Sequence, residues 1–115
     1  MDTINRDELR GKIDQGDRFR LVETLPEDSF HEGHIPGAVN LPPDRIRDAA
    51  AGMLPDHDEE IVVYCGSASC SASEDAARQL ADQGYTRVRR YVGGKQDWKD
   101  AGMPIEASST AKSSP

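Results

Sequence analysis

No stretch of this sequence approaches the roughly 20 consecutive apolar residues that a membrane-spanning helix needs, and only 36% of its residues are hydrophobic. The N-terminal stretch from Met1 to Glu8 also lacks the basic and apolar regions of a secretory signal peptide. We therefore expect a cytoplasmic protein without a membrane partner. Its 115 residues are enough for one domain with a single core.

Positive charge is also scarce. The chain has 14 Lys and Arg residues against 21 Asp and Glu residues, which gives a formal net charge of −7. Binding to nucleic acid needs a basic surface, so we do not expect nucleic acid as a partner. The acidic balance also mildly repels small anions.

Cysteine is nearly absent, since the chain has only Cys65 and Cys70. Two cysteines cannot complete a structural zinc site, and the spacing of His31, His34 and His57 does not match that of zinc ligands. We therefore expect neither a metal nor another cofactor. A cytosolic setting argues against a structural disulfide, and closing so short a loop adds less stability than closing a long one.

Strand and helix patterns alternate along the chain. Residues 61–64 form a continuous β-branched and aromatic run, which is typical of a strand covered on both faces. The alternation predicts an α/β fold with a parallel sheet and helices on both faces. Cys65 follows the central strand at its carboxyl end, where such sheets bind ligands. The other strands are predicted at residues 19–23, 38–41 and 87–92, and helices at residues 7–13, 44–53, 71–83 and 96–101 and from Pro26 onward.

The loop after Cys65 consists of small residues and has no Lys, Arg or His. Residues 71–74 read Ser-Ala-Ser-Glu, the spacing of a capping box, which predicts a helix start directly after Cys70. A strand–loop–helix junction of this kind offers backbone N–H groups to an anion. Cys65 is therefore expected to be partly thiolate and nucleophilic, although a buried cysteine packed as a small hydrophobe is the alternative. The predicted substrate-binding residues are Gly66, Ser67, Ala68, Ser69 and Ser71.

Several segments, taken in order, resemble the single-domain rhodanese family: residues 32–40 with their Gly-His-Ile-Pro-Gly-Ala stretch, the strand ending in Cys65, and the Gly93-Gly94 pair followed by Trp98. The resemblance covers about Ile4 to Glu106 and implies a rhodanese-like α/β domain over residues 1–106 with a five-stranded parallel sheet. The Ser-rich residues 107–115 are predicted to be a disordered tail.

The resemblance also implies an activity, that of a sulfurtransferase of the thiosulfate sulfurtransferase class. In that reading Cys65 takes a sulfane sulfur from a donor such as thiosulfate or a persulfide. The resulting Cys65 persulfide then passes the sulfur to a thiophilic acceptor, such as a thiol or cyanide. A thioredoxin-like protein is a candidate partner.

The sequence departs from the family pattern at several places. The first matching strand commonly ends in Asp-Val-Arg, whereas residues 22–24 read Val-Glu-Thr. Cys70 stands where many relatives have a basic residue, so thiosulfate binding would depend on backbone N–H groups alone. The sixth residue after Cys65 is Ser71, not the arginine that phosphatase and arsenate reductase relatives need to hold three charged oxygens. Arg89 and Arg90 lie near the carboxyl end of their predicted strand, where one reading is that they supply distant positive charge to the loop; we expect them instead to be solvated surface residues.

The sequence allows two roles for Cys70. It is a candidate resolving thiol, which would attack a Cys65 persulfide or sulfenic acid and form a disulfide, or it fills a small pocket under the loop. The alternatives to a sulfurtransferase are a thiol redox protein that cycles a Cys65–Cys70 disulfide and a non-catalytic rhodanese-like interaction module. We expect His34 to fix its own turn, Glu23 to brace neighbouring loops and Trp98 to fill the core.

Overall fold

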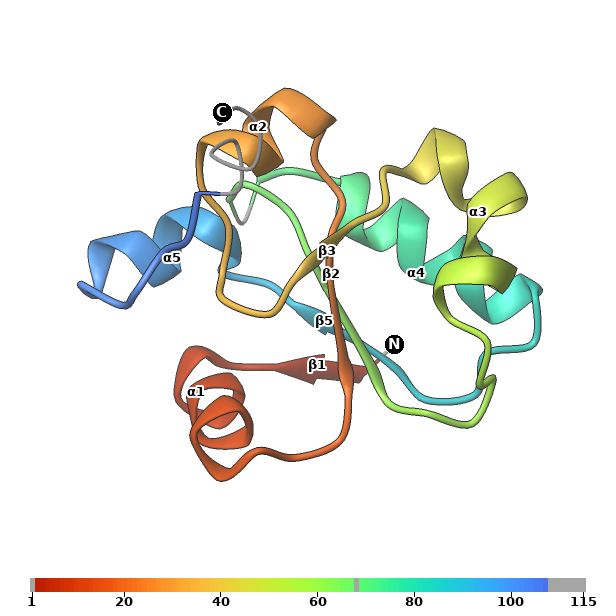
Figure 1. Cartoon of the computed structure of the whole chain (residues 1–115), viewed down its shortest axis with the longest axis horizontal. Coiled ribbons are helices and arrows are strands. Elements are labelled where there is room, and N and C mark those ends of the chain that lie inside the picture. The colour runs from red at the N-terminus through yellow and green to blue at the C-terminus, as the bar shows by residue number, and fades with distance from the viewer. Residues whose placement is uncertain (1, 68, 108–115) are drawn as a thin grey trace, which may run out of the picture.

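A computed structural model describes residues 2–67 and 69–107. Within them, five parallel strands form one sheet in the order β1-β5-β4-β2-β3 (Figure 1). This confirms the predicted five-stranded parallel α/β fold. Residues 108–115 of the predicted tail lie outside the described residues. The strands are β1 (Asp2–Ile4), β2 (Arg20–Glu23), β3 (Val39–Asn40), β4 (Ile61–Tyr64) and β5 (Val88–Tyr91).

Helices cover both faces of the sheet (Figure 1). Alternate residues of β4 face opposite cores: Ile61 and Val63 pack with residues of α3 and α4, and Val62 and Tyr64 pack with residues of α1 and α5. All four side chains are fully buried, as predicted for a strand covered on both faces. The helices are α1 (Arg6–Gln15), α2 (Glu27–Glu32), α3 (Ile46–Met53), α4 (Ala72–Asp82) and α5 (Gly94–Asp100), with a 3-10 turn η1 (Pro43–Arg45) before α3.

The edge strand β1 is the element that the sequence pattern did not reveal. It is three residues long, and Ile4, its only buried residue, pairs with Tyr91 of β5. A capping box follows at once: the Asn5 side chain accepts the N–H of Glu8 at 2.8 Å, and the Glu8 carboxylate accepts the N–H of Asn5 at 3.0 Å. These two hydrogen bonds fix the chain direction between β1 and α1.

The capping box predicted at residues 71–74 is wrong. α4 does begin at Ala72, but the Ser71 hydroxyl makes no capping hydrogen bond. Its backbone has helical angles, φ −96° and ψ −1°, whereas a capping side chain reaches the first turn from an extended backbone. The Glu74 carboxylate pairs instead with Arg78, one turn later, at 2.9 Å.

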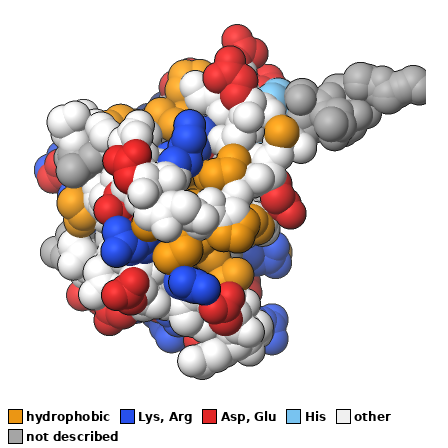
Figure 2. Space-filling view, turned by 90° about the vertical axis from the view of Figure 1, so that its left-hand side faces the viewer, with side chains coloured by type: hydrophobic (Ala, Val, Ile, Leu, Met, Phe, Trp, Pro, Cys, Tyr) orange, Lys and Arg blue, Asp and Glu red, His pale blue; other side chains and the backbone are white. Residues whose placement is uncertain are grey.

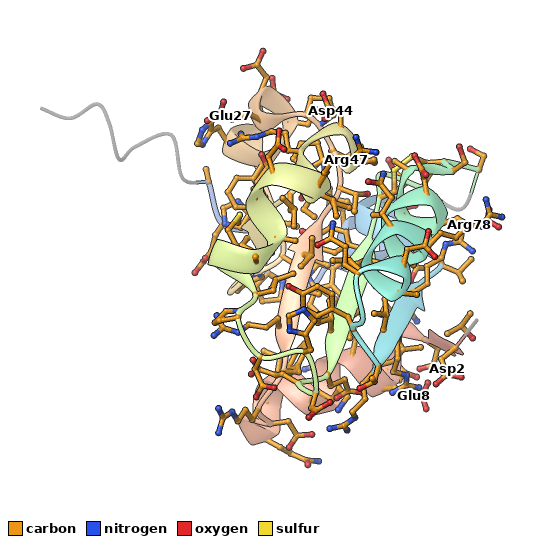
Figure 3. All side chains as sticks on the ribbon, turned by 90° about the vertical axis from the view of Figure 1, so that its right-hand side faces the viewer. Asp2, Glu8, Glu27, Asp44, Arg47 and Arg78 are labelled. Atoms are coloured by element: carbon orange, nitrogen blue, oxygen red, sulfur yellow. A yellow bond between two sulfur atoms is a disulfide. The ribbon has the colours of Figure 1, made fainter. Side chains whose placement is uncertain are left out.

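Charged side chains cover the outside of the molecule. Arg47 of α3 and Arg78 of α4 project outward from their helices (Figure 3). On the face shown in Figure 2, Lys and Arg side chains alternate with acidic ones, so that face has no continuous basic patch. Among the residues that the structure describes, no helix has the length and apolar character needed to cross a membrane.

Glu60, the residue before β4, gives the stability of the fold a pH dependence. Burial disfavours its ionised form, but the ion pairs with Lys12 and with Arg89 (3.4 Å) outweigh burial and lower the pKa of Glu60. Because the pKa is lowered by folding, the ionised carboxylate stabilises the fold above its ordinary pKa. That stabilisation is lost as the pH falls through the lowered value.

We therefore expect Glu60→Gln to lower the free energy of unfolding by about 1–3 kcal/mol at neutral pH. The difference from wild type should shrink in acid, because the wild-type carboxyl is then protonated as well. Urea unfolding of both proteins across this pH range measures the difference. A difference that stays the same in acid would contradict the role of the Glu60 charge.

Candidate active site

Cys65 lies at the carboxyl edge of the sheet, directly after the central strand β4. Its carbonyl oxygen accepts the N–H of Lys95 at 2.8 Å, and the carbonyl oxygen of Gly66 accepts the N–H of Gln96 at 2.8 Å. Both donors belong to the first turn of α5. Two hydrogen bonds thus hold the start of the loop against α5, and the Cys65 residue is only 1% exposed.

Gly94 makes this close contact possible. Its φ of +73° is in the left-handed region that favours glycine. A Cβ atom at this position would lie 2.7 Å from the Cys65 carbonyl oxygen and 2.9 Å from the Ser67 nitrogen. Gly94 is therefore more than a turn residue, because the Cys65 loop rests directly on it.

The structure joins Cys65 and Cys70 in a disulfide. Their Cα atoms are 6.2 Å apart, within the range of protein disulfides. A turn brings Cys70 back toward β4, since its N–H donates to the Ser67 carbonyl oxygen at 3.1 Å. Cys70 is partly exposed, whereas Cys65 is buried. The loop is therefore described in the oxidised form of a dithiol pair.

The residues predicted to bind substrate lie together in the segment between β4 and α4, apart from Ala68, which is outside the described residues. The hydroxyl groups of Ser67 and Ser69 are 3.1 Å apart and hydrogen-bonded, and Ser71 is exposed just before α4. Within residues 2–67 and 69–107, the N–H groups of Gly66, Ser67 and Ser69 meet no acceptor. They remain available to an anion, and their role in binding stays a prediction.

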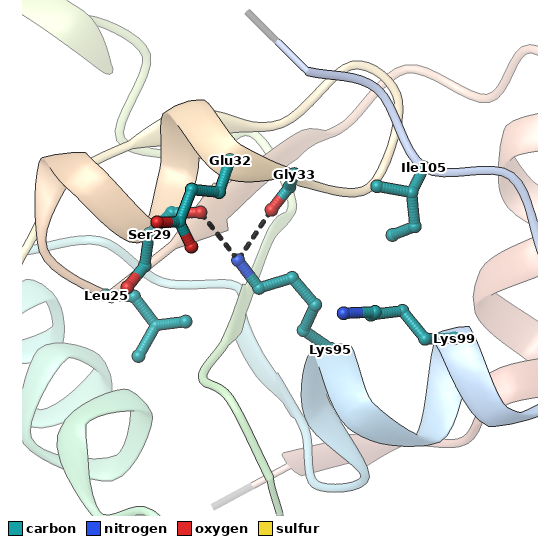
Figure 4. Close-up of a pocket in the computed structure, with 7 residues that line it drawn as sticks. All are labelled: Leu25, Ser29, Glu32, Gly33, Lys95, Lys99 and Ile105. Atoms are coloured by element: carbon teal, nitrogen blue, oxygen red, sulfur yellow. Dashed lines mark hydrogen bonds between the residues drawn. The ribbon is translucent and has the colours of Figure 1, made fainter. Parts of the chain in front are cut away.

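A buried polar network lies under the Cys65 loop. The carboxylate of Glu23, which is 0% exposed, accepts hydrogen bonds from the Tyr64 hydroxyl at 2.7 Å and from Lys95 Nζ at 3.0 Å. Burial and the Glu23 carboxylate raise the pKa of Tyr64, so its hydroxyl stays a neutral donor. Lys95 Nζ also donates to the carbonyl oxygens of Ser29 and Gly33 (Figure 4). The network confirms the bracing role predicted for Glu23.

Lys95 is the residue of this site that the sequence reasoning missed. Its main-chain N–H holds the Cys65 carbonyl, and its side chain holds three oxygens from β2, α2 and the following turn. A single lysine after two glycines gives no sequence signal of burial, because lysines are mostly exposed. The role of Lys95 is visible only in the structure, where its Nζ atom pairs with the buried carboxylate of Glu23.

A cavity of about 190 Å³ adjoins the loop. A Cβ atom on Gly66 would lie 3.7 Å from the Leu25 side chain, which lines the cavity. The cavity combines apolar side chains with the charges of Glu32 and Lys99 (Figure 4). Its lining residues are Leu25, Ser29, Glu32, Gly33, Lys95, Lys99 and Ile105.

The prediction that Arg89 and Arg90 are solvated surface residues is wrong, because both are half-buried and hydrogen-bonded. Arg89 pairs with Glu60 and donates to the Thr3 carbonyl oxygen at 2.9 Å. Arg90 donates to the Ser73 hydroxyl in the first turn of α4 at 3.0 Å. The parallel pairing of β5 between β1 and β4 gives both side chains polar neighbours that the linear pattern did not show.

The predictions for His34 and Trp98 are confirmed. The His34 ring is buried and stacks on Phe30 with 3.9 Å between ring centroids, and its Nδ1 atom is 2.9 Å from the Phe30 carbonyl oxygen. Trp98 fills the core on the α5 side of the sheet, and its Nε1 donates to the Pro104 carbonyl oxygen at 2.7 Å. Among the described residues, no group of three His, Cys, Asp or Glu side chains is placed to hold a metal ion.

The chain is similar to known proteins over nearly its whole length. The family model for the rhodanese-like domain matches residues 5–101. The HTH-type transcriptional regulator Rv0324 of Mycobacterium tuberculosis is 37% identical over 105 residues, which are 91% of this chain and 45% of the regulator. The thiosulfate sulfurtransferase PspE of Escherichia coli is 31% identical over 83 residues, which are 72% of this chain and 74% of PspE.

Solved structures agree with these matches. The human single-domain sulfurtransferase TSTD1 superimposes with a TM-score of 0.76 at 27% identity, over 87% of this chain and 96% of that one. Several curated relatives are longer proteins. The chain spans less than half the length of three of them, including the regulator.

Proposed function

Because the chain belongs to the rhodanese-like domain family, we propose that it is a sulfurtransferase of the thiosulfate sulfurtransferase class that carries a sulfane sulfur on Cys65. The observation that carries this proposal is the placement of Cys65. It follows the central strand and begins a small-residue loop that α5 holds in place. The sulfurtransferase names of PspE and TSTD1 support the assignment.

The transfer begins from the reduced protein. The Cys65 thiolate attacks the outer sulfur of a donor persulfide, the S–S bond of the donor breaks, and the donor thiolate leaves. The new persulfide anion is stabilised by loop N–H groups such as those of Gly66 and Ser69. A thiol or cyanide then attacks the outer sulfur and returns Cys65 to the thiolate, so no cofactor takes part.

The charges around the loop favour a persulfide of a small thiol over thiosulfate. Thiosulfate carries two negative charges, and two cations near the loop are already engaged: Arg90 with Ser73 and Lys95 with Glu23. A persulfide carries one charge, and its organic group can occupy the cavity beside Leu25. Lys99, which has no acidic partner among the described residues, can pair with a carboxylate there. We propose that the exchange takes place in the cytoplasm and that a thioredoxin-like protein reduces the Cys65–Cys70 disulfide beforehand.

The test uses the Cys70→Ser variant, in which Cys65 is the only thiol. After incubation with a small-thiol persulfide and desalting, intact-mass spectrometry should show the gain of one sulfur atom, and added cyanide should remove it as thiocyanate. Cys65→Ser is the control. Its residue 65 should gain no sulfur, so no thiocyanate should arise from that position. A Cys70→Ser protein that gains no sulfur would overturn the proposal.

A further inference from the structure

We infer that Cys70 converts the sulfur carried by Cys65 into hydrogen sulfide, so that the domain acts as a dithiol-dependent persulfide reductase. This inference rests on the proposed loading of Cys65. It concerns the step that follows loading. It also identifies the class of the second substrate, a dithiol that reduces the resulting Cys65–Cys70 disulfide. It replaces transfer to an outside acceptor with an attack from within the loop.

The geometry for this attack is present in the oxidised loop. The Sγ atom of Cys70 is bonded to the Sγ atom of Cys65, the same atom that would carry the outer sulfur in a persulfide. Cys65 is held by the N–H of Lys95 and by contact with Gly94, whereas Cys70 approaches through the turn that starts at Ser67. The attacking thiol is thus part of the same short loop as its target, five residues along the chain.

The reaction balances with these two cysteines alone. The Cys70 thiolate attacks the Sγ atom of the Cys65 persulfide, the bond between Cys65 Sγ and the outer sulfur breaks, and the outer sulfur leaves as hydrosulfide with the electron pair. Overall, a donor persulfide and the protein dithiol give the donor thiol, hydrogen sulfide and the protein disulfide. The outer sulfur is reduced, and the two cysteines are oxidised.

The exposure of the two cysteine residues gives the order in which the disulfide is opened. Cys65 is 1% exposed in the disulfide, whereas Cys70 is partly exposed and therefore the more accessible of the two to an outside thiol. An incoming dithiol therefore attacks Cys70, and Cys65 leaves as a thiolate into the loop where N–H groups stabilise it. The second thiol of the reductant then releases Cys70, and both cysteines are reduced again.

A single-turnover experiment tests this step. Reduced, desalted wild-type protein is mixed with one equivalent of glutathione persulfide without added reductant, and hydrogen sulfide and intact mass are followed together. Wild type should release close to one equivalent of sulfide and end as the Cys65–Cys70 disulfide. Cys70→Ser should keep the sulfur on Cys65 and release sulfide at least about tenfold more slowly. Cys65→Ser gives the background rate of a thiol at position 70.

Each outcome has a clear meaning. Sulfide release by Cys70→Ser at the wild-type rate, or a persulfide that persists on wild-type Cys65, would overturn the role of Cys70 and leave the proposed sulfurtransferase intact. Absence of added sulfur on Cys70→Ser would overturn the proposed function itself. Peptide mapping of a stalled reaction with a monothiol provides a further check, since the mixed disulfide should form on Cys70. A mixed disulfide on Cys65 would contradict the order of attack.

Discussion

Gly94→Ala is expected to lower the free energy of unfolding by about 2–4 kcal/mol and to slow sulfur loading of Cys65 by at least about tenfold. The added Cβ atom meets the Cys65 carbonyl oxygen at 2.7 Å and the Ser67 nitrogen at 2.9 Å, distances that real Cβ atoms do not tolerate. The loop must move to relieve the overlap, and its hydrogen bonds to Lys95 and Gln96 lengthen. Cys65 then loses the position from which it attacks.

Gly102→Ala is a matched control for this change. Gly102 has a φ of +76°, close to the +73° of Gly94, but a Cβ atom there meets no atom within 4 Å. The control therefore measures the left-handed backbone penalty alone, about 1–2 kcal/mol, and should leave sulfur loading unchanged. Urea unfolding and the rate of persulfide formation on a Cys70→Ser background measure both quantities. Equal effects of the two substitutions would contradict a contact role for Gly94.

The fold was predictable because its central elements carry strong local patterns. Residues 61–64 are all β-branched or aromatic, and the apolar stripe of α4 is followed by Gly84, so each element is recognisable alone. Alternation of such elements leaves few topologies, and the position of Cys65 at the carboxyl edge follows from that order. β1 was missed because a short edge strand with one buried residue, Ile4, has no pattern of its own and is defined by its pairing with β5.

The surroundings of Cys65 were less predictable because they come from segments distant in sequence. The Glu23–Lys95 ion pair joins residues 72 positions apart, and nothing near either residue indicates its partner. The capping box failed for a related reason. The spacing of Ser71 and Glu74 is correct, but the backbone of Ser71 is set by the loop that precedes it, and that backbone has helical angles. The sequence therefore predicted the position of Cys65 at the carboxyl edge of the sheet but not the residues that hold its loop.

Lys95→Met is expected to lower the free energy of unfolding by about 3–5 kcal/mol, because it leaves a buried carboxylate without its cation. Among the described residues, the fully buried Glu23 carboxylate keeps only the Tyr64 hydroxyl as a donor. The Gly33 carbonyl oxygen loses the hydrogen bond from Lys95, and the Ser29 carbonyl oxygen keeps only the Gly33 N–H at 3.3 Å. The methionine side chain is only one atom shorter than that of lysine and keeps its apolar stem, so the loss mainly reports the charge and its hydrogen bonds. The change is large against the total stability of about 5–15 kcal/mol that is typical of single domains.

Lys99→Met provides the control, since Lys99 lies one turn later on α5 and is exposed. Its loss should change stability by less than about 0.5 kcal/mol. The double variant Glu23→Gln with Lys95→Met removes both charges and should be more stable than Lys95→Met alone, because no unpaired charge remains buried. Urea unfolding of wild type, Glu23→Gln, Lys95→Met and the double variant completes a double-mutant cycle. If the two single substitutions at Glu23 and Lys95 were additive, the ion pair would not be what holds α5 to the strands beneath the Cys65 loop.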